Sequence, residues 1–462
     1  MRIILVLVLC ICSWVCVLAQ QNLGIRSSNY AGIQGSLLNP SSIADSKLKW
    51  DLNILSVGEV FDNTFLFAPK NSLRFFGIRK IIKGSIDEDL FFTHFDPQNP
   101  NKLYNVTLST EFLGPSFFLK LKKNHWIGIT VTGRAYANIK NISGAAAQNA
   151  FDYFKNKGLW NTDLQDNSTR INAMGWLQYG LHYATVLYRN GRDELKAGIS
   201  LNYLQGIAAA YVKNTHINYK IIDTSNFIFT NASVDYGRTD FKEDRKPNDG
   251  HGFGADIGFT YVHLDPQKNK YIYRLGLSVI DVGSINFNRN ASSYHLQADS
   301  ANLQNWHQLK FSNNMQLDQT LSAIFYNGDS TRSLTSNHFK MGLPAAISVQ
   351  ADWNAYKNYF LNATIIKGLG HSSGQGVTRP DIYSITPRYE TKWLEVSLPV
   401  SLIDYGHLRP RVGLAVRAGY FFIGGDALGP LLKINNLEGV DFYAGIHYFV
   451  TEKQKTAKVS SQ

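Results

Sequence analysis

The stretch GFGADIGFTYVH at residues 252–263 alternates between large apolar side chains and small or polar ones. Successive side chains of a β-strand point to opposite faces, so this period of two predicts a strand with one apolar and one polar or bare face. The glycines at 252, 254 and 258 fall in the bare phase, where they allow strand curvature and leave space for a lumen. The apolar phase contains Phe253, Ala255, Ile257, Phe259 and Tyr261.

The same alternation recurs from residue 50 to residue 450, for example in residues 346–354 and 411–420. An antiparallel sandwich with one solvated face would also alternate. Many candidate strands, however, are long enough to match the roughly 9–11 tilted residues that cross a bilayer, rather than the roughly five or six of globular strands. Because only a closed barrel pairs every strand in lipid, we predict an all-β transmembrane antiparallel β-barrel of about 14 strands (range about 12 to 16).

The strands are placed by this alternation and by the turn residues between them. Short turns such as residues 122–125 and 356–358 are typical of the periplasmic side of such barrels, and longer segments are typical of the outer side. Residues 145–157 and 313–326 have helical spacing instead, the second with Ser312 as its N-cap, and we expect them at the barrel mouth or inside it. The predicted strands are 49–58, 62–69, 103–112, 115–123, 126–138, 175–189, 194–206, 216–236, 251–264, 271–288, 344–354, 357–367, 381–391, 393–404, 409–421 and 439–450.

The composition departs from that of a soluble domain. Aromatic residues make up 13% of the chain and charged residues 18%, which is below the roughly 25% charged residues of soluble domains. An outward apolar band with aromatic girdles accounts for both departures. The formal net charge is +11, but the basic residues are scattered singly, whereas nucleic-acid binding needs a basic patch. We therefore expect outer-membrane lipid as a partner and no nucleic acid.

The first nineteen residues read as a signal peptide. Arg2 precedes an uncharged apolar run that ends in the small-residue pattern at residues 17–19. A membrane anchor and lipidation at Cys16 are the alternatives, and the residues before Cys16 fit a lipidation site poorly. All three cysteines, at positions 10, 12 and 16, lie in this segment. We predict a signal peptide at 1–19, a plug-like segment at 20–48, the barrel at 49–450 and a disordered polar tail at 451–462.

Several blocks resemble FadL-like outer-membrane proteins. Ser28-Asn29-Tyr30-Ala31-Gly32, followed by residues 38–44 with the turn Asn39-Pro40, is similar to the turn that closes the N-terminal plug of those proteins and leads into the barrel. The glycine-rich strand at 252–258, Leu343-Pro344 at the start of a strand and the closing strand at 440–450 are similar as well. The resemblance implies a barrel that passes hydrophobic solutes.

A narrower resemblance covers nearly the whole chain after the signal peptide. The blocks at residues 386–390, 396–399 and 422–426 look like an uncharacterised outer-membrane barrel family of Bacteroidota. That family is related to FadL and to the PorV barrel of type IX secretion. This second relation implies a different role, in which a non-transporting barrel serves as a scaffold or shuttle for surface proteins.

Sequence motifs that resemble catalytic, dinucleotide-binding or metal-binding sites lack the neighbouring residues or elements that such sites need. Residues 370–374, GHSSG, match the Gly-x-Ser-x-Gly nucleophile elbow, which needs a strand, a strained turn and a helix. Here another strand follows, so the motif favours a flexible hairpin loop. The glycines at 252, 254 and 258 depart from the dinucleotide fingerprint in spacing, and no helix follows them. The twelve histidines include no pair at i, i+2 or i, i+4 that would favour a metal. We predict no enzyme activity, no cofactor and no metal.

Polar residues in the inward phase of the predicted strands are the candidate site. Arg or Lys facing lipid would cost about 2–4 kcal/mol at the bilayer midplane, so these side chains should line the lumen. They either form an ion-paired network that fixes the barrel or guide a solute. The candidates are Asp256, Arg274, Gln350, Asp352, Asn362, Arg388, Glu390, Glu395, Arg411, Arg417 and Asp441, with Asn39 and Pro40 as the plug turn.

Three functions follow from these predictions. The first is an outer-membrane barrel that passes or binds small or hydrophobic solutes, and the second is the scaffold or shuttle in surface-protein secretion. The third is an outer-membrane hydrolase, which would require a Ser-His pair within hydrogen-bonding reach. The expected partners are the barrel-assembly machinery and either a solute or secretion partners, and the expected location is the cell outer membrane.

Overall fold

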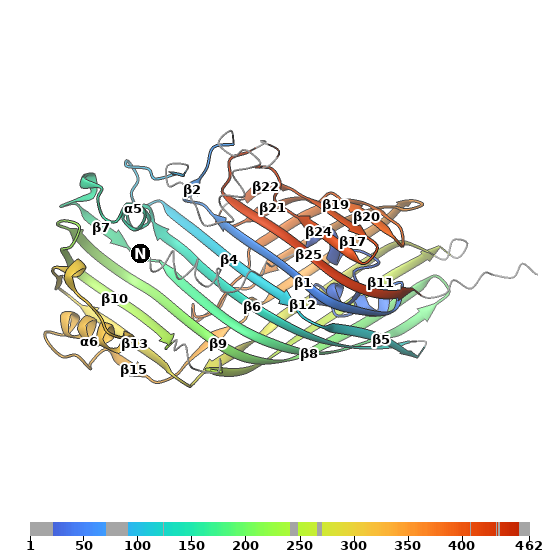
Figure 1. Cartoon of the computed structure of the whole chain (residues 1–462), viewed down its shortest axis with the longest axis horizontal. Coiled ribbons are helices and arrows are strands. Elements are labelled where there is room, and N and C mark those ends of the chain that lie inside the picture. The colour runs from blue at the N-terminus through green and yellow to red at the C-terminus, as the bar shows by residue number, and fades with distance from the viewer. Residues whose placement is uncertain are drawn as a thin grey trace, which may run out of the picture.

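The computed structural model describes residues 22–70, 91–122, 124–240, 248–265, 270–406, 408–430, 432 and 435–451. These residues form a closed 14-strand antiparallel barrel with a few short helices (Figure 1), which confirms the predicted fold class. The predicted signal peptide lies outside the described residues, as does the predicted tail beyond Thr451, the last residue of the closing strand. Among the described residues, no helix has the length and apolarity needed to cross a bilayer.

The barrel wall closes where its last strand pairs with its first, with Leu52 opposite Tyr448 and Leu55 opposite Ile446. In order around the ring, the wall consists of β1 (Leu48–Asn63), β4 (Leu103–Leu113) continued by β5 (Ser116–Lys122), β6 (His125–Ser143), β8 (Arg170–Asn190), β9 (Asp193–Ile221), β11 (Gly250–Asp265), β12 (Lys270–Phe287), β16 (Phe339–Gly342) continued by β17 (Ala346–Tyr356), β18 (Tyr359–Gly368), β19 (Asp381–Glu390), β20 (Leu394–Ser397) continued by β21 (Val400–Asp404), β22 (Leu408–Val412) continued by β23 (Leu414–Ala418), β24 (Phe421–Gly425) and β25 (Gly439–Thr451).

Several wall strands are interrupted where proline enters the ladder. Proline has no N–H to donate, so each proline removes one hydrogen bond from the ladder. Pro387 and Pro410 are tolerated within β19 and β22, whereas three others lie at interruptions. Pro115 separates β4 from β5, Pro344 separates β16 from β17, and Pro399 separates β20 from β21. The predictions of unbroken strands at 393–404 and 409–421 are therefore wrong, the second because the ladder also breaks at Gly413.

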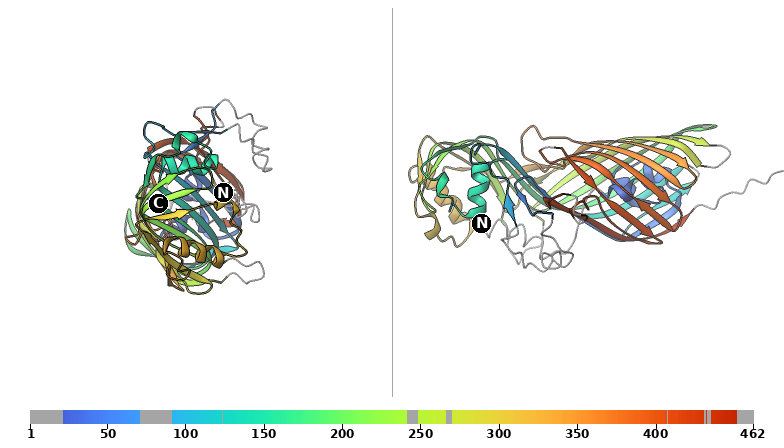
Figure 2. Two further views of the ribbon diagram at one scale, coloured as in Figure 1. Left: turned by 90° about the vertical axis from the view of Figure 1, so that its left-hand side faces the viewer. Right: turned by 90° about the horizontal axis from the view of Figure 1, so that it is seen from above.

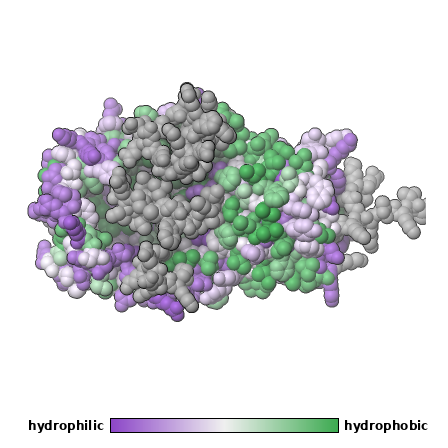
Figure 3. Space-filling view, in the orientation of Figure 1, coloured by the Kyte–Doolittle hydropathy of each residue, from purple (hydrophilic) through white to green (hydrophobic). Residues whose placement is uncertain are grey.

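The outward face of the wall carries a band of exposed apolar side chains (Figure 3). On β8 the band runs from Tyr179 to Tyr188, both exposed, with Leu181 between them 58% exposed. Nine residues at about 3.3 Å each, tilted by about 40°, span about 23 Å, close to the roughly 25 Å apolar band of membrane barrels. Stacked aromatic side chains lie at both ends of the band. Tyr203 stacks on His251 at one end, and His263 stacks on Tyr273 at the other.

A charge placed in this band should destabilise the barrel. Leu277 is 51% exposed in the middle of the β12 band, so Leu277→Arg should lower the free energy of unfolding by about 2–4 kcal/mol. Urea unfolding in liposomes, followed by tryptophan fluorescence, measures this change. Met315→Arg is the matched control, because Met315 is 62% exposed on a helix away from the band. Equal stability of the two variants would show that the band does not face lipid.

The barrel continues as a sheet well beyond the apolar band on the side away from the short turns (Figures 1 and 2). The residues of β9 from Tyr203 to Ile221 lie beyond the band. They extend over about 45 Å, at about 3.3 Å per residue and about 40° of tilt. This part, the outer extension, also contains β7 (Asp163–Asp166), β10 (Phe227–Thr239), β13 (Ala291–Ala298), β14 (Ala301–Leu303) and β15 (Leu334–Ser336).

Two predicted strands are wrong in this region. The strand predicted at 216–236 is two strands, β9 and β10, because Asp223 turns the chain by accepting hydrogen bonds from the N–H groups of Ser225 and Asn226 at 2.8 and 3.0 Å. The strand predicted at 62–69 is also wrong. β1 includes Asn63. Further on, β2 (Leu66–Phe67) pairs with β3 (Phe92–Thr93), and Ala68 forms a single bridge with Leu437.

Two longer helices pack on the outer extension, α5 (Gly144–Asp152) and α6 (Asn314–Phe325), with the short helices η3 (Lys157–Leu159) and η4 (Trp306–Gln308) near them. Ser143 caps α5. The predicted cap of the second helix, Ser312, is wrong by one residue, because Asn313 Oδ1 accepts the N–H of Gln316 at 2.9 Å. Helical spacing therefore located both helices, whereas the cap depended on local side-chain geometry.

The chain before the first strand lies inside the barrel (Figure 2). This N-terminal segment, residues 22–47, forms α2 (Leu23–Arg26), η1 (Gly32–Leu37) and α3 (Ser42–Asp45). Most of its side chains are buried, and Ile33 and Ile43 are 0% exposed. The segment thus fills the lumen at the end of the barrel that carries the short turns.

Candidate functional site: the filled lumen

The turn Asn39-Pro40-Ser41 rests against a bare patch of the wall. Gly198 and Gly258 are directly paired on β9 and β11. A Cβ on Gly198 would come within 2.4 Å of Pro40 and Ser41 backbone atoms, and one on Gly258 within 2.1 Å of Asn39 Oδ1. Only glycine lets the turn approach the wall this closely. The small residues in the inward phase of the strand alternation therefore also provide the surface on which the turn packs.

Side-chain hydrogen bonds hold this turn. Asn39 Nδ2 donates to Gln350 Oε1 at 3.0 Å and to the Phe259 carbonyl at 3.2 Å. Its Oδ1 accepts the Ser41 hydroxyl at 2.7 Å, and Ser41 Oγ lies 2.6 Å from Thr260 Oγ1 on the wall. The turn is therefore fixed by amides and hydroxyls rather than by backbone pairing with the wall.

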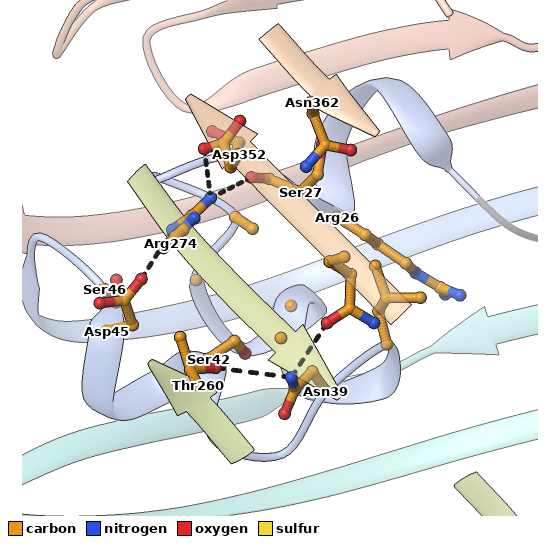
Figure 4. Close-up of a pocket in the computed structure, with 17 residues that line it drawn as sticks. Arg26, Ser27, Asn39, Ser42, Asp45, Ser46, Thr260, Arg274, Asp352 and Asn362 are labelled. Carbon is orange, nitrogen blue, oxygen red and sulfur yellow. Dashed lines mark hydrogen bonds and ion pairs between the residues drawn. The ribbon is translucent and has the colours of Figure 1, made fainter. Parts of the chain in front are cut away.

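Arg274 of β12 joins the N-terminal segment to the wall (Figure 4). Its guanidinium binds Asp45 of the segment at 2.8 Å and Asp352 of β17 at 3.0 Å. It also donates to Asn29 Oδ1 of the segment at 3.1 Å. Lys196 of β9 binds Asp45 at 2.6 Å from the other side. Burial acts to raise the pKa of Asp45, but Lys196 and Arg274 together hold it below its ordinary value.

A second cluster continues around the wall. Arg388 binds Asp352 and Glu390, each at 2.9 Å. Glu390 accepts Asn29 Nδ2 at 2.7 Å, and Glu395 accepts the Ser28 hydroxyl at 2.7 Å. Arg417 completes the series by binding Glu395 at 3.1 Å and the carbonyls of the turn at residues 391–392.

The structure thus brings seven of the predicted candidates together around the N-terminal segment: Arg274, Gln350, Asp352, Arg388, Glu390, Glu395 and Arg417. Asn362 lines the same pocket. Two candidates lie elsewhere, with Arg411 bound to Asp62 and Asp256 bound to Asn202 at 2.8 Å. Asp441 contacts the segment only indirectly, by accepting the Asp426 N–H at 2.8 Å while Asp426 accepts the Leu23 N–H at 3.0 Å.

A charged network above the segment escaped the sequence prediction. Asp281 of β12 accepts both Arg134 of β6, with Nη2 at 2.9 Å, and Arg379. Glu111 of β4 binds Arg134 at 3.3 Å and Arg26 of the segment. Glu111 and Arg134 follow the inward phase of their strands and could have been found. Asp281 lies at a bulge with φ +56°, so strand alternation does not report its direction.

The connection from β18 to β19, residues 369–380, folds into the lumen and is named the lumen loop. Asn172 of β8 donates to the Gly374 carbonyl at 3.3 Å and accepts the Gly376 N–H at 3.2 Å. Asn138 of β6 accepts the Thr378 N–H at 2.8 Å. The loop therefore joins wall strands that β9, β11, β12 and β17 separate along the ring. It does connect two strands, as predicted, but it is bound across the lumen instead of standing free.

An apolar layer lies at the level of this loop. Trp176, Leu204, Phe287 and Met341 are each 0% exposed there. Val377 of the lumen loop belongs to the same cluster. The full layer consists of Tyr136, Met174, Trp176, Leu204, Ala209, Tyr211, Ile285, Phe287, Ala291, Phe339, Met341, Leu343 and Val377.

The inward residues of β6 give the order of these levels along the barrel axis. Gly128 lies against the N-terminal segment and Arg134 in the charged network. Tyr136 follows in the apolar layer, Asn138 at the lumen loop and Lys140 at the outer mouth. The described lumen is therefore filled at three levels, by the segment, by the network and by the layer with its loop.

A polar pocket remains between the N-terminal segment and the wall (Figure 4). Its volume is about 50 Å³, and its lining includes Arg26, Ser42, Asp45, Arg274 and Asp352. Asp352 Oδ1 and Ser42 Oγ are buried without a hydrogen-bond partner among the described residues. No group of three or more His, Cys, Asp or Glu side chains suited to a metal occurs in the part of the chain that the structure describes.

A closed antiparallel barrel with an outward apolar band and a polar, filled lumen defines a transmembrane β-barrel. The chain belongs to the family described as a family of unknown function (DUF5723), whose model matches residues 40–426. No curated protein matches the chain.

Several solved structures are similar to this one. A deltaS2 mutant of the monoaromatic hydrocarbon channel TodX is 10% identical, with 92% of this chain and 95% of that chain covered and a TM-score of 0.46. The toluene transporter TodX of P. putida is 8% identical, with 92% and 95% covered and a TM-score of 0.42. The toluene transporter TbuX of Ralstonia pickettii is 10% identical, with 92% and 95% covered and a TM-score of 0.41.

Proposed function

We propose that this chain is an outer-membrane barrel that binds and passes small or hydrophobic solutes, and that the N-terminal segment is its removable closure. One observation carries the proposal. The segment is attached to the wall by side-chain hydrogen bonds and ion pairs, such as those of Asn39 and Arg274, and by no backbone ladder. Since the backbone pairing of the wall strands closes the ring without the segment, the segment can move while the barrel stays folded.

Two features of the lumen support this role. The polar pocket leaves room beside the segment, and its unpartnered Asp352 Oδ1 favours water there. The apolar layer around Trp176 and Phe287 offers contacts to a hydrophobic solute once the lumen loop moves. Export by a signal peptide, insertion by the barrel-assembly machinery and membership among Bacteroidota barrels belong to the same proposal.

Single-channel recording in planar bilayers, with solute uptake into liposomes, tests the proposal. The wild type should show brief discrete openings. Arg274→Gln should raise the open probability several-fold, because it removes the charge that joins Asp45 to Asp352. Arg192→Gln, at an exposed residue in the turn before β9, is the matched control and should behave as wild type. Silence of the wild type and of Arg274→Gln, both verified as folded, would contradict the proposal.

A non-transporting scaffold for surface proteins is the second candidate. The outer extension favours it, because five strands and two helices stand beyond the apolar band where a secreted partner could bind. Removal of the N-terminal segment separates the two candidates. A barrel that lacks residues 22–45 and shows no more ion or solute flux than the wild type would favour the scaffold, whereas an increased flux past the network and the lumen loop would favour the solute route.

A further inference from the structure

Three basic residues face one another across three neighbouring strands at the outer mouth. Lys140 of β6 is directly opposite Arg170 of β8, and Arg170 is directly opposite Lys213 of β9. Lys140 and Arg170 are exposed, and Lys213 is half-buried. We name this row the basic rung.

The basic rung faces the lumen. Lys140 and Arg170 are each two residues from Asn138 and Asn172, which hold the lumen loop, and side chains two apart in a strand share a face. Lys213 is likewise two residues from Tyr211 of the apolar layer. A Cβ on Gly374 would lie 3.4 Å from Arg170 Cζ, so the guanidinium rests against the lumen loop.

The arrangement is unfavourable without a ligand. Directly opposed side chains have Cβ atoms about 4.5–5.5 Å apart, and like charges at this distance destabilise a sheet. Most buried arginines in this barrel have an acidic partner, as Arg388 has Asp352. None of the three rung residues forms an ion pair with any residue that the structure describes.

Nearby carboxylates do not resolve the repulsion. Asp235 is opposite Lys213 in the next strand, but His295 binds it at 2.7 Å. Asp381 and Asp404 attract Lys140 and Arg170 repels it, but neither carboxylate lies within ion-pair distance of the lysine. Asp381, in turn, already binds Lys367. Among the described residues, the rung therefore retains a cationic surface open to an anion.

We propose that the basic rung binds a compact soluble anion with two or more negative charges, of the phosphate-ester or pyrophosphate class. Adjacent strands are about 4.8 Å apart, so the row extends over about 10 Å. Arginine at its centre can hold a phosphate through two N–H groups, and a lysine on each side adds a point charge. The inference deepens the proposed function and rests on it for its physiological meaning, because it names a class of solute collected above the lumen loop.

A lipid headgroup does not fit this position. Arg170 is nine residues beyond Tyr179, which marks the edge of the apolar band on β8. That separation corresponds to about 23 Å at about 3.3 Å per residue and about 40° of tilt. The rung also faces inward, so the phosphates of the surrounding leaflet lie out of its reach.

Isothermal titration of the purified full chain with inorganic pyrophosphate tests the proposal. The wild type should bind at low ionic strength, and affinity should fall as salt is added. The triple variant Lys140→Gln, Arg170→Gln, Lys213→Gln should bind at least about tenfold more weakly. The matched control is Lys49→Gln, Arg192→Gln, Lys357→Gln, which removes the same charges from exposed residues at the opposite rim and should bind as wild type.

Two results would overturn the inference. One is the absence of pyrophosphate binding by the folded wild type at low salt, and the other is an equal affinity of the rung and control variants. Because titration does not require an open lumen, this test fails separately from the proposed function. A barrel that passes solutes but binds no pyrophosphate would contradict only the inference of anion binding at the basic rung. A barrel that binds pyrophosphate but passes no solute would contradict only the proposed function.

Discussion

Oxidation of the double variant Ser41→Cys, Thr260→Cys should abolish solute flux through the reconstituted barrel, and reduction should restore it. The two hydroxyl oxygens lie 2.6 Å apart, with Ser41 in the N-terminal segment and Thr260 on β11. Two sulfur atoms in these positions can form a disulfide, since disulfides join Cβ atoms about 3.5–4.5 Å apart. The three cysteines of the chain, Cys10, Cys12 and Cys16, lie outside the described residues, and serine at all three positions removes competing disulfide pairs. Liposome swelling before and after reduction measures the effect.

The pair Ser293→Cys, Thr335→Cys is the control for this experiment. Its hydroxyl oxygens are 3.2 Å apart within the outer extension, between β13 and β15. Its oxidation should leave flux unchanged, because it joins no part of the N-terminal segment to the wall. If oxidation of the Ser41–Thr260 pair is complete and flux persists, the segment is not the closure.

Asp281→Asn should lower the free energy of unfolding by about 3–5 kcal/mol, the range observed when one partner of a buried ion pair is removed. Asp281 is 5% exposed and is bound by two buried arginines, Arg134 and Arg379. Arg379 would be left without its carboxylate at the base of the lumen loop, and Arg134 would retain only Glu111. Urea unfolding followed by tryptophan fluorescence measures the change.

Asp240→Asn is the control, since Asp240 forms a more exposed pair with Arg238 in the outer extension. Its effect should stay below about 1 kcal/mol, as for other surface pairs. Adding Arg379→Gln to Asp281→Asn should recover part of the loss, because it removes one of the two uncompensated charges. Equal effects of Asp281→Asn and Asp240→Asn would mean that water already screens the network.

The wall was predictable because its signal is local. Alternation along residues 252–263 assigns each side chain to the lipid or to the lumen without knowledge of the neighbouring strands. The same reasoning assigned Arg274, Asp352 and Arg388 to the lumen-facing phase. It failed where the backbone departs from regular pairing, as at the bulge of Asp281 and in the turn at Asp223. There a side-chain hydrogen bond or an extra residue, and not the period, sets the direction.

The alternation of side chains along the strands could not predict which residues the lumen residues contact. Alternation indicates that Asp352 points inward, but not that Arg274, Arg388 and Tyr271 meet there from two other strands. Arg379 carries no strand signal at all, because it lies in the lumen loop and reaches Asp281 across the lumen. Contacts between residues far apart in the chain depend on strand order and register, which a single sequence does not specify.

The sequence by itself determined that this protein is a membrane barrel and which phase of each strand meets lipid, because side-chain alternation and apolar content act over a few neighbouring residues. The tertiary structure alone decided that the lumen is closed at three levels and that Lys140, Arg170 and Lys213 share one row. The physical reason is the closure of the barrel, which brings strands from distant parts of the chain into register. Inward side chains of different strands then lie close enough to form ion pairs or to oppose one another as like charges.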